Sequence, residues 1–165
     1  MDEEIKLYGN AILKYCFGIL CDFHEAQDAM QETFARAFFA REKLKSQENF
    51  KAWIYKIAYN ICLNMLRKRR FFYAPANENE GSYQMDEPFI DSVLLDALLI
   101  LPPKDRALFY NRAVEDMDYS QLEALYSTRA ATLRKRYERA KNKLKNYLLE
   151  TGFAENTSEG VSAYE

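Results

Sequence analysis

Apolar residues recur at helical spacing along most of the chain. The clearest case lies between Asn49 and Arg70, where one apolar stripe meets neither Pro nor Gly: Phe50, Trp53, Ile54, Ile57, Ile61 and Met65. Such spacing places the stripe on one face of an amphipathic helix. The stretch ends in four cations, Arg67, Lys68, Arg69 and Arg70. Positive charge there suits the helix dipole, and it could also grip a phosphate backbone. We expect a long helix with a basic end that docks on nucleic acid; a core helix with a solvated basic end is the alternative.

Two further stretches with helical periodicity precede this helix. We expect one helix from Glu3 to Leu20 and another from about Glu25 to Arg41, with a short connection at residues 22–24. On the second helix, three polar residues fall on the face opposite the inward stripe: Asp28, Gln31 and Glu32. An acidic helix face is either solvated surface or a docking face, and the spacing alone leaves both interpretations open.

The periodicity breaks between Tyr73 and Glu87. This stretch is polar and acidic and contains Pro and Gly, as flexible linkers do. Beyond it we expect four helices: from Pro88 to the Pro102-Pro103 pair, from there to about Glu115, from Tyr119 to Tyr126, and from the turn at 127–129 to about Leu149. Residues 151–165 are small, polar and acidic, and we expect them to be disordered.

The short helix, the turn Ser127-Thr128-Arg129 and the long last helix have the layout of a helix-turn-helix. The last helix is strongly basic, since between Arg129 and Lys145 eight cations oppose a single acid, Glu138. A helical hairpin alone is weak evidence, because any bundle contains some. The concentration of charge on its second helix favours DNA binding.

The net charge of −2 conceals a segregation of charge along the chain. Residues 1–73 carry 12 basic and 9 acidic side chains, and residues 95–150 carry 11 basic and 8 acidic ones. Between them, residues 74–94 carry five acids and no base. Local fields matter more than the total, so two basic blocks separated by an acidic strap are compatible with nucleic-acid binding.

Composition sets the fold class. With 165 residues, 48% of them apolar, and with 5 Gly and 4 Pro, the chain can bury substantial cores but does not favour a sheet-rich fold. We expect an all-α protein of two small helical domains, residues 1–73 and 88–150, the second with the helix-turn-helix. The acidic flexible linker at 74–87 joins them, and we expect the domains to move independently around it.

Several other classes of protein are disfavoured. The single histidine, His24, provides no His-based triad or HExxH metal site, and no Gly-rich loop cradles a phosphate. The three cysteines show no CxxC spacing, so we expect reduced core thiols in a cytoplasmic protein, with no zinc site. No apolar run reaches about 18 residues, so we expect no membrane insertion. We expect no catalytic residue, no metal and no cofactor.

Four patterns stand in order along the chain. Residues 25–38 (EAQDAMQETFARAF) match an Asp-x-x-Gln-Glu-x-Phe helix, and residues 50–60 (FKAWIYKIAYN) match Phe-x-x-Trp-Leu-x-x-Ile-Ala-x-Asn. Leu101, Pro102 and Arg106 fit Leu-Pro-x-x-x-Arg. Residues 132–144 (TLRKRYERAKNKL) fit Thr-Val-x-x-Arg-x-x-Arg-Ala-x-x-x-Leu. Together, over about residues 5 to 149, these motifs resemble an RNA polymerase sigma factor of the extracytoplasmic-function (ECF) type, in the sigma-70 family.

The resemblance implies a factor that directs promoter recognition, DNA melting and transcription initiation and leaves catalysis to the polymerase. The first domain would dock on core RNA polymerase through Asp28, Gln31 and Glu32 and open the minus-10 element, and the second would read the minus-35 element. The implied DNA-binding residues are Trp53, Asn60, Asn64, Arg67, Lys68, Arg69, Arg70, Arg129, Thr132, Arg134, Lys135, Arg136 and Arg139. The implied partners are core RNA polymerase and promoter DNA, with an anti-sigma factor as a further candidate.

Three residues depart from the family pattern. Asn64 stands where many members have Asp, Glu123 where a small Ala is usual, and Ser127 where the turn normally has Gly. A Glu buried at the crossing of the two helices would be costly, so we expect a slightly splayed helix-turn-helix.

Two rival interpretations remain. A stand-alone helix-turn-helix regulator would need only the second domain. It would assign no function to the face formed by Asp28, Gln31 and Glu32. A helical metalloenzyme or purely structural bundle would leave the basic last helix unexplained.

Overall fold

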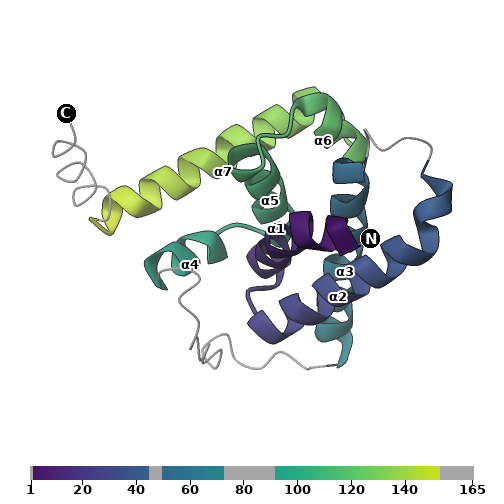
Figure 1. The fold of residues 1–165 in the computed structure, drawn as a ribbon. Coiled ribbons are helices and arrows are strands. Elements are labelled where there is room, and N and C mark those ends of the chain that lie inside the picture. Colours follow the sequence, from purple (N-terminus) through teal and green to yellow (C-terminus); the bar gives the residue numbers. More distant parts are fainter. Residues whose placement is uncertain (1, 45–49, 73–91, 153–165) are drawn as a thin grey trace, which may run out of the picture.

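The computed structural model describes residues 2–44, 50–72 and 92–152, and all regular structure in these ranges is helical (Figure 1). In the first half the helices are α1 (Asp2–Leu20), α2 (Phe23–Ala40), a 3-10 turn η1 (Arg41–Lys43) and α3 (Phe50–Phe72). In the second half they are α4 (Ser92–Leu99), α5 (Pro103–Phe109), η3 (Tyr110–Val114), α6 (Tyr119–Tyr126) and α7 (Ala130–Glu150). The predicted all-α class is confirmed.

Most helix boundaries agree with the periodicity of the sequence, and α6 has the predicted limits. The predicted start of the second helix at Glu25 is wrong by two residues. Asp22 acts as the N-cap, because its side chain accepts a hydrogen bond of 2.9 Å from the Glu25 amide, so the helix begins at Phe23. The expected linker at 74–87, the expected helix start at Pro88 and the tail beyond Gly152 lie outside the described residues.

The predicted helix from Pro103 to Glu115 is not α-helical over its whole length. After Phe109 the backbone continues as the π-helical turn η3, in which the Glu115 amide donates to the Tyr110 carbonyl at 3.2 Å. The wider turn is associated with a fully buried Asn111, whose carbonyl accepts a hydrogen bond from the Met117 amide at 3.0 Å. Such π turns are rare and often lie at functional positions.

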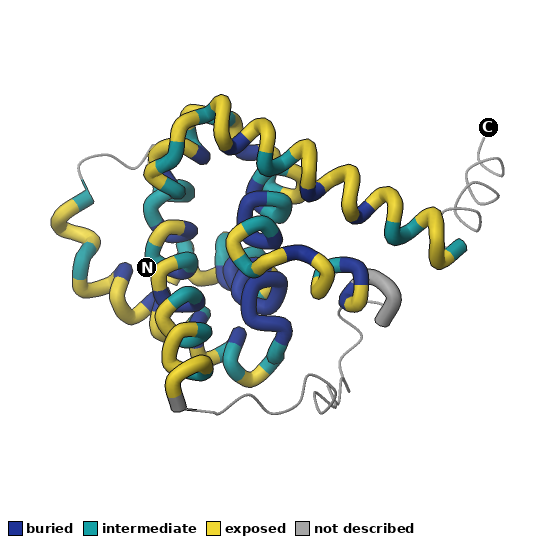
Figure 2. The backbone as a smooth tube through the Cα atoms, turned by 180° about the vertical axis from the view of Figure 1, so that it is seen from behind, coloured by how far each residue is buried: buried dark blue, intermediate teal, exposed yellow. Residues whose placement is uncertain are grey.

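The buried core is continuous across the two halves of the chain. It joins Tyr15, Phe17 and Ile19 of α1 and Ile54 and Ile61 of α3 with residues of the second half: Leu95, Ala107, Leu108, Met117, Leu122, Leu125 and Leu133. Buried positions gather in the middle of the molecule, where α1 and α5 lie (Figure 2). The two sequence-predicted domains therefore pack against each other in this structure.

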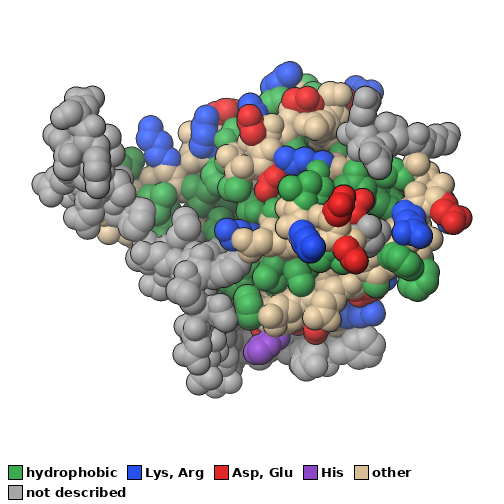
Figure 3. Space-filling view, in the orientation of Figure 1, with side chains coloured by type: hydrophobic (Ala, Val, Ile, Leu, Met, Phe, Trp, Pro, Cys, Tyr) green, Lys and Arg blue, Asp and Glu red, His purple; other side chains and the backbone are tan. Residues whose placement is uncertain are grey.

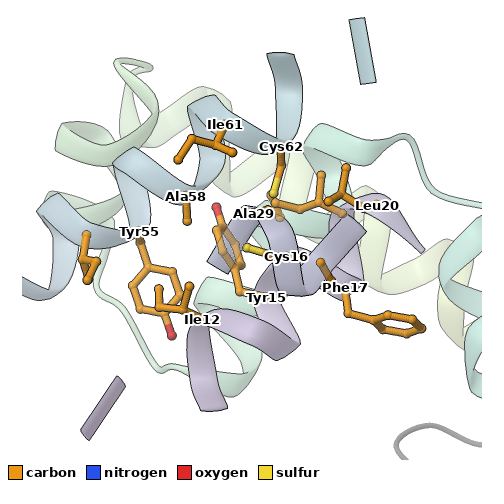
Figure 4. Close-up of a cluster of buried hydrophobic side chains, with 14 of the residues drawn as sticks. Ile12, Tyr15, Cys16, Phe17, Leu20, Ala29, Tyr55, Ala58, Ile61 and Cys62 are labelled. Carbon is orange, nitrogen blue, oxygen red and sulfur yellow. The ribbon is translucent and has the colours of Figure 1, made fainter. Parts of the chain in front are cut away.

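Within the first half, α1 is the central element. Tyr15 and Cys16 of α1 point towards Ala58 and Cys62 of α3, in the cluster drawn in Figure 4. The Tyr15 ring lies edge-on to that of Tyr55, with centroids 4.8 Å apart. All three cysteines are free and buried, and a hydrogen bond to Cys62, together with burial, holds the pKa of the Cys16 thiol well above its ordinary value.

The second half has a smaller cluster of its own. Ala97 and Leu101 pack with Ala140 and Leu144 of α7, and Phe109 stacks on Tyr137 with ring centroids 5.8 Å apart. Beyond these contacts α7 extends past the rest of the bundle (yellow-green in Figure 1). The helix α7 is thus attached through three buried positions, Leu133, Ala140 and Leu144, and most of its other residues are exposed.

Candidate nucleic-acid interface

The outward face of α2 carries the predicted docking residues. Asp28, Gln31 and Glu32 are all exposed, because the buried side of the helix is formed by Ala26, Ala29, Thr33, Phe34 and Ala37. Glu32 forms an ion pair with Arg36 one turn further on. Phe39, two turns after Glu32 and therefore on the same face, is 84% exposed. The face thus combines carboxylate, amide and aromatic groups. Phe39 was not predicted as a site residue, although its position seven residues after Glu32 could have indicated it.

The basic end of α3 is only partly free. Asn60, Asn64, Arg67, Lys68 and Arg70 are exposed, and Arg67 donates to the Asn64 side-chain oxygen at 3.3 Å. Arg69 differs, because it forms an ion pair with Glu25 of α2 and donates to the Leu20 carbonyl at 3.4 Å. Its charge therefore stabilises the end of α1, where cations are favourable.

Trp53 also has a structural partner. It is half-buried, packs against the core, and its ring lies 5.8 Å from that of Phe50. Its packing accounts for its place in the apolar stripe.

A groove of about 560 Å³ connects the α2 face with the basic end of α3. Its walls contain both polar and apolar groups: Glu32, Arg36, Ile61, Asn64, Met65, Arg67, Lys68 and Phe71. Phe71 is 80% exposed and was not predicted as a site residue. An aromatic side chain directly after a run of four cations is the sequence signal that could have identified it.

The helix-turn-helix forms as predicted. Asp118 and Gln121 make a reciprocal capping box that starts α6, and Leu122 and Leu125 of α6 and Leu133 of α7 are buried in the core. Ser127 adopts the left-handed conformation, with φ of 49°, that Gly would adopt more easily. The sequence therefore places a strained but tolerated residue at the turn.

The cost on which the expected splaying of the helix-turn-helix rested does not arise, because Glu123 is not buried at the helix crossing. Glu123 is exposed, and its carboxylate accepts a hydrogen bond of 2.5 Å from the Ala130 amide at the start of α7. The N-cap residue of α7, Arg129, provides no side-chain hydrogen bond, so Glu123 takes over the capping. This departure from the family pattern stabilises the turn.

The cations of α7 fall into two groups. Arg129, Arg134, Lys135 and Arg139 are exposed, as is Thr132, and Lys and Arg side chains line the upper edge of the molecule over α7 (blue in Figure 3). Arg134 lies over the Tyr119 ring, 4.7 Å from its centroid, which orients the guanidinium. Arg139 donates to the Lys135 carbonyl at 3.3 Å.

Arg136 belongs to the second group. Its Nε and Nη2 donate to one carboxylate oxygen of Asp105 on α5, at 3.0 and 2.8 Å. Both side chains are about one quarter exposed, so Arg136 fastens α7 to α5 in this structure. The charge count along α7 therefore overstates the charge free for a nucleic acid.

Other kinds of site find little support within the described ranges. There, no three or more His, Cys, Asp or Glu side chains gather in a group that could hold a metal ion. No described helix is both long and apolar enough to cross a membrane.

The comparisons with known proteins agree with this layout. The family model described as Sigma-70 region 2 matches residues 5–72. The chain is 26% identical over 157 residues to the "ECF RNA polymerase sigma factor SigE" of Mycolicibacterium smegmatis, and 24% identical over 163 residues to the "ECF RNA polymerase sigma factor SigW" of Bacillus subtilis. These matches cover 89% and 88% of this chain, and 61% and 87% of the respective relatives.

A solved structure has the same fold. The sigma factor RpoE of Bartonella quintana, determined in complex with the anti-sigma factor NepR, superposes with a TM-score of 0.74 at 21% identity. The match covers 89% of this chain and 95% of that one, so it includes helices from both halves.

Proposed function

The chain belongs to the extracytoplasmic-function (ECF) group of the sigma-70 family, and we propose that it directs core RNA polymerase to promoters and helps to open them. It would do so as a binding factor in the cytoplasm, with catalysis left to the polymerase. The observation that carries this proposal is the coincidence of the region 2 match at 5–72 with the exposed Asp28–Gln31–Glu32 face and the basic end of α3.

The roles of the two halves follow from their chemistry. The α2 face supplies carboxylate and amide groups for a basic surface of the polymerase. Exposed Asn60, Asn64 and Arg67 would contact bases and phosphates of the minus-10 element. Arg134, Lys135 and Arg139 on α7 would enter the major groove at the minus-35 element, where Arg and Lys recognise guanine.

The relatives also favour this function over a stand-alone regulator. Both SigE and SigW match along nearly the whole chain, including the first half that a simple helix-turn-helix regulator would not need. By analogy with the RpoE complex, an anti-sigma factor is a candidate partner for this chain as well.

The test of the docking face is a double substitution, Gln31→Ala with Glu32→Ala. We expect weaker binding of purified core polymerase with unchanged helicity by circular dichroism, since both side chains are exposed. The matched control removes an exposed amide and an exposed acid elsewhere, Asn146→Ala with Glu150→Ala on α7. If the α2 variant binds core as tightly as the parent, the face is solvated surface and the docking assignment is wrong.

The test of the whole function is run-off transcription. Purified core with this protein should initiate at discrete sites on genomic DNA, whereas core alone should not. A protein that bound promoter duplexes but never supported initiation would instead be a regulator of the stand-alone class.

A further inference from the structure

The first half of α7 carries one acid on a surface that is otherwise basic. Between Arg129 and Lys145 the sequence has eight cations and a single acid, Glu138. Glu138 lines an open surface depression of about 530 Å³ together with three cations, Arg134, Lys135 and Arg139. All four side chains are exposed. A carboxylate at this place repels the phosphates of a nucleic acid, so general attraction between opposite charges does not account for it.

Glu138 lies near the middle of the outward face of α7. Successive residues of an α-helix turn by about 100°, which places Glu138 about 40° from Arg134 and about 60° from Lys135, between the two. The buried positions Leu133 and Ala140 lie on the opposite side of the helix. When such a helix lies in the major groove, the middle of its outward face meets the base edges and its flanks meet the phosphates. Glu138 therefore lies where a side chain can read sequence.

The fold makes little use of this carboxylate. Among the described residues its partner is Lys141, whose Nζ donates to Oε1 at 3.2 Å and lies 3.1 Å from Oε2. Both side chains are at least half exposed, and exposed pairs of this kind contribute little to stability. Lys141 also lies over the Tyr137 ring, 5.7 Å from its centroid, so it keeps a contact when Glu138 turns towards a ligand. Glu123 of α6, by contrast, is engaged as the cap of α7.

The chemistry of a carboxylate selects one base in the major groove. An ionised carboxylate only accepts hydrogen bonds. In this groove guanine presents two acceptors, thymine presents an acceptor and a methyl group, and adenine presents an acceptor, N7, beside its N6 amino group. Cytosine presents the N4 amino group, which is a donor. A carboxylate is therefore repelled by guanine and thymine, is disfavoured at adenine, and accepts a hydrogen bond from cytosine.

We infer that Glu138 is a specificity-determining residue of α7, which selects a cytosine by accepting a hydrogen bond from its N4 amino group. Arg134, proposed above to recognise guanine, lies one turn earlier and about 6 Å away along the helix axis, so the cytosine and the guanine lie within about two base pairs of each other. The negative charge of Glu138 weakens binding to every duplex and increases the discrimination between them. The inference rests on the proposed function, in which α7 reads the upstream element, and it adds a base that the cations do not select.

The test determines which base pair each variant prefers. The full-length protein, by itself and bound to core polymerase, selects duplexes from a random pool, and binding is then measured with every base pair at each position of the selected duplex. For the parent we expect one position at which cytosine is favoured over the other three bases by at least about fivefold. Glu138→Ala should abolish that preference and tighten binding to unrelated duplexes, because one negative charge is lost. Its helicity by circular dichroism should not change, since the side chain is exposed.

Glu138→Gln gives the sharper result. A glutamine amide pairs with N6 and N7 of adenine, so the preference at that one position should change from cytosine to adenine. The matched control is Glu150→Gln, which removes the same charge from an exposed position at the end of α7 and should leave every preference unchanged. Lys141→Gln breaks the ion pair but retains the carboxylate, so it should weaken binding to all duplexes alike. A parent that favours cytosine at no position, or a Glu138→Gln variant with the preferences of the parent, would overturn the inference.

Run-off transcription separates this inference from the proposed function. Initiation at discrete sites, with the same dependence on each upstream base pair for the parent and for Glu138→Gln, would overturn the inference and leave the function standing. A preference that changes from cytosine to adenine in the duplex measurements, without any initiation by core polymerase, would refute the function and leave the base recognition established. A full-length protein that selects no duplex, with or without core, would overturn the inference whatever the transcription assay shows.

Discussion

The two basic helices, α3 and α7, use their charge in different ways. In α3 four consecutive cations, Arg67 to Arg70, lie near the end of the helix, after a long stretch whose buried residues include Ile54, Tyr55, Ala58, Ile61 and Cys62. In α7 they are spread over most of the helix, and the buried positions are Leu133, Ala140 and Leu144. The first helix is a core element with a basic tip, and the second is a basic surface with three points of attachment.

The two helices nevertheless share one feature. In each, a cation within the basic stretch forms an ion pair with another helix: Arg69 of α3 pairs with Glu25, and Arg136 of α7 pairs with Asp105. Charge density along a helix therefore predicts where a nucleic acid is attracted, but not which side chains are free to contact it. The predictions that follow test this division of roles.

The largest effect on stability is expected from a substitution at Leu133, the first buried position of α7. Leu133 of α7 is fully buried in the core, so Leu133→Ala should lower the free energy of unfolding by about 2–5 kcal/mol, as cavity-forming substitutions do. Urea denaturation followed by circular dichroism measures it. Leu149→Ala, at a position 53% exposed, is the control and should change stability by less than about 0.5 kcal/mol. Equal effects would mean that α7 is not anchored at Leu133.

The second largest effect on stability is expected for Arg136, the α7 cation that pairs with Asp105. Arg136→Gln should destabilise the protein by about 1.5–3 kcal/mol, because it leaves the Asp105 carboxylate partly buried without its two hydrogen bonds. Lys135→Gln, one residue earlier and exposed, should leave the unfolding midpoint almost unchanged. If Lys135→Gln destabilised as much as Arg136→Gln, the distinction between internal and external cations of α7 would fail.

Recognition of a specific base should depend on Arg134, whose guanidinium is oriented by Tyr119. Arg134→Ala should cost about 1–3 kcal/mol in binding to the cognate upstream element and relax the preference at one base pair. Lys143→Ala should weaken binding to all duplexes alike and reduce the salt dependence by about one ion. Binding to matched and mismatched duplexes at several salt concentrations separates the two effects. Equal losses on every duplex would make α7 an electrostatic anchor without base specificity.

The smallest effect on stability is expected for Arg69, the α3 cation that pairs with Glu25. Arg69→Gln breaks the pair with Glu25, but both side chains are about one third exposed or more, so solvent screening limits the loss of stability to about 0.2–1 kcal/mol. Thermal unfolding of Arg69→Gln, Glu25→Gln and the double variant gives the coupling between the two residues. A coupling above about 2 kcal/mol would show that Arg69 is as important to α3 as Arg136 is to α7.

Local sequence patterns predicted much of this protein. The apolar periodicity indicated α1, α3 and α7, and α6 was predicted at its observed limits because Asp118 and Ser127 mark its two ends. The outward placement of Asp28, Gln31 and Glu32 also followed from spacing, since residues three and four apart share a helix face. The four ordered motifs were sufficient to indicate the sigma-70 family. The linker at 74–87 stays a prediction.

What the sequence could not determine is the partner of each charge. Arg106 reaches carbonyls 87 and 88 residues away, Arg69 pairs 44 residues away, and Arg136 pairs 31 residues away. Glu123, which was expected to be costly if it were buried, is exposed and caps the start of α7. Helical periodicity is a property of neighbours within one or two turns, so the sequence determines it by itself. The choice between a solvated cation, an ion pair and a helix cap depends on which distant backbone comes close, and only the tertiary packing of α1 against α5 and α7 against α5 decides that.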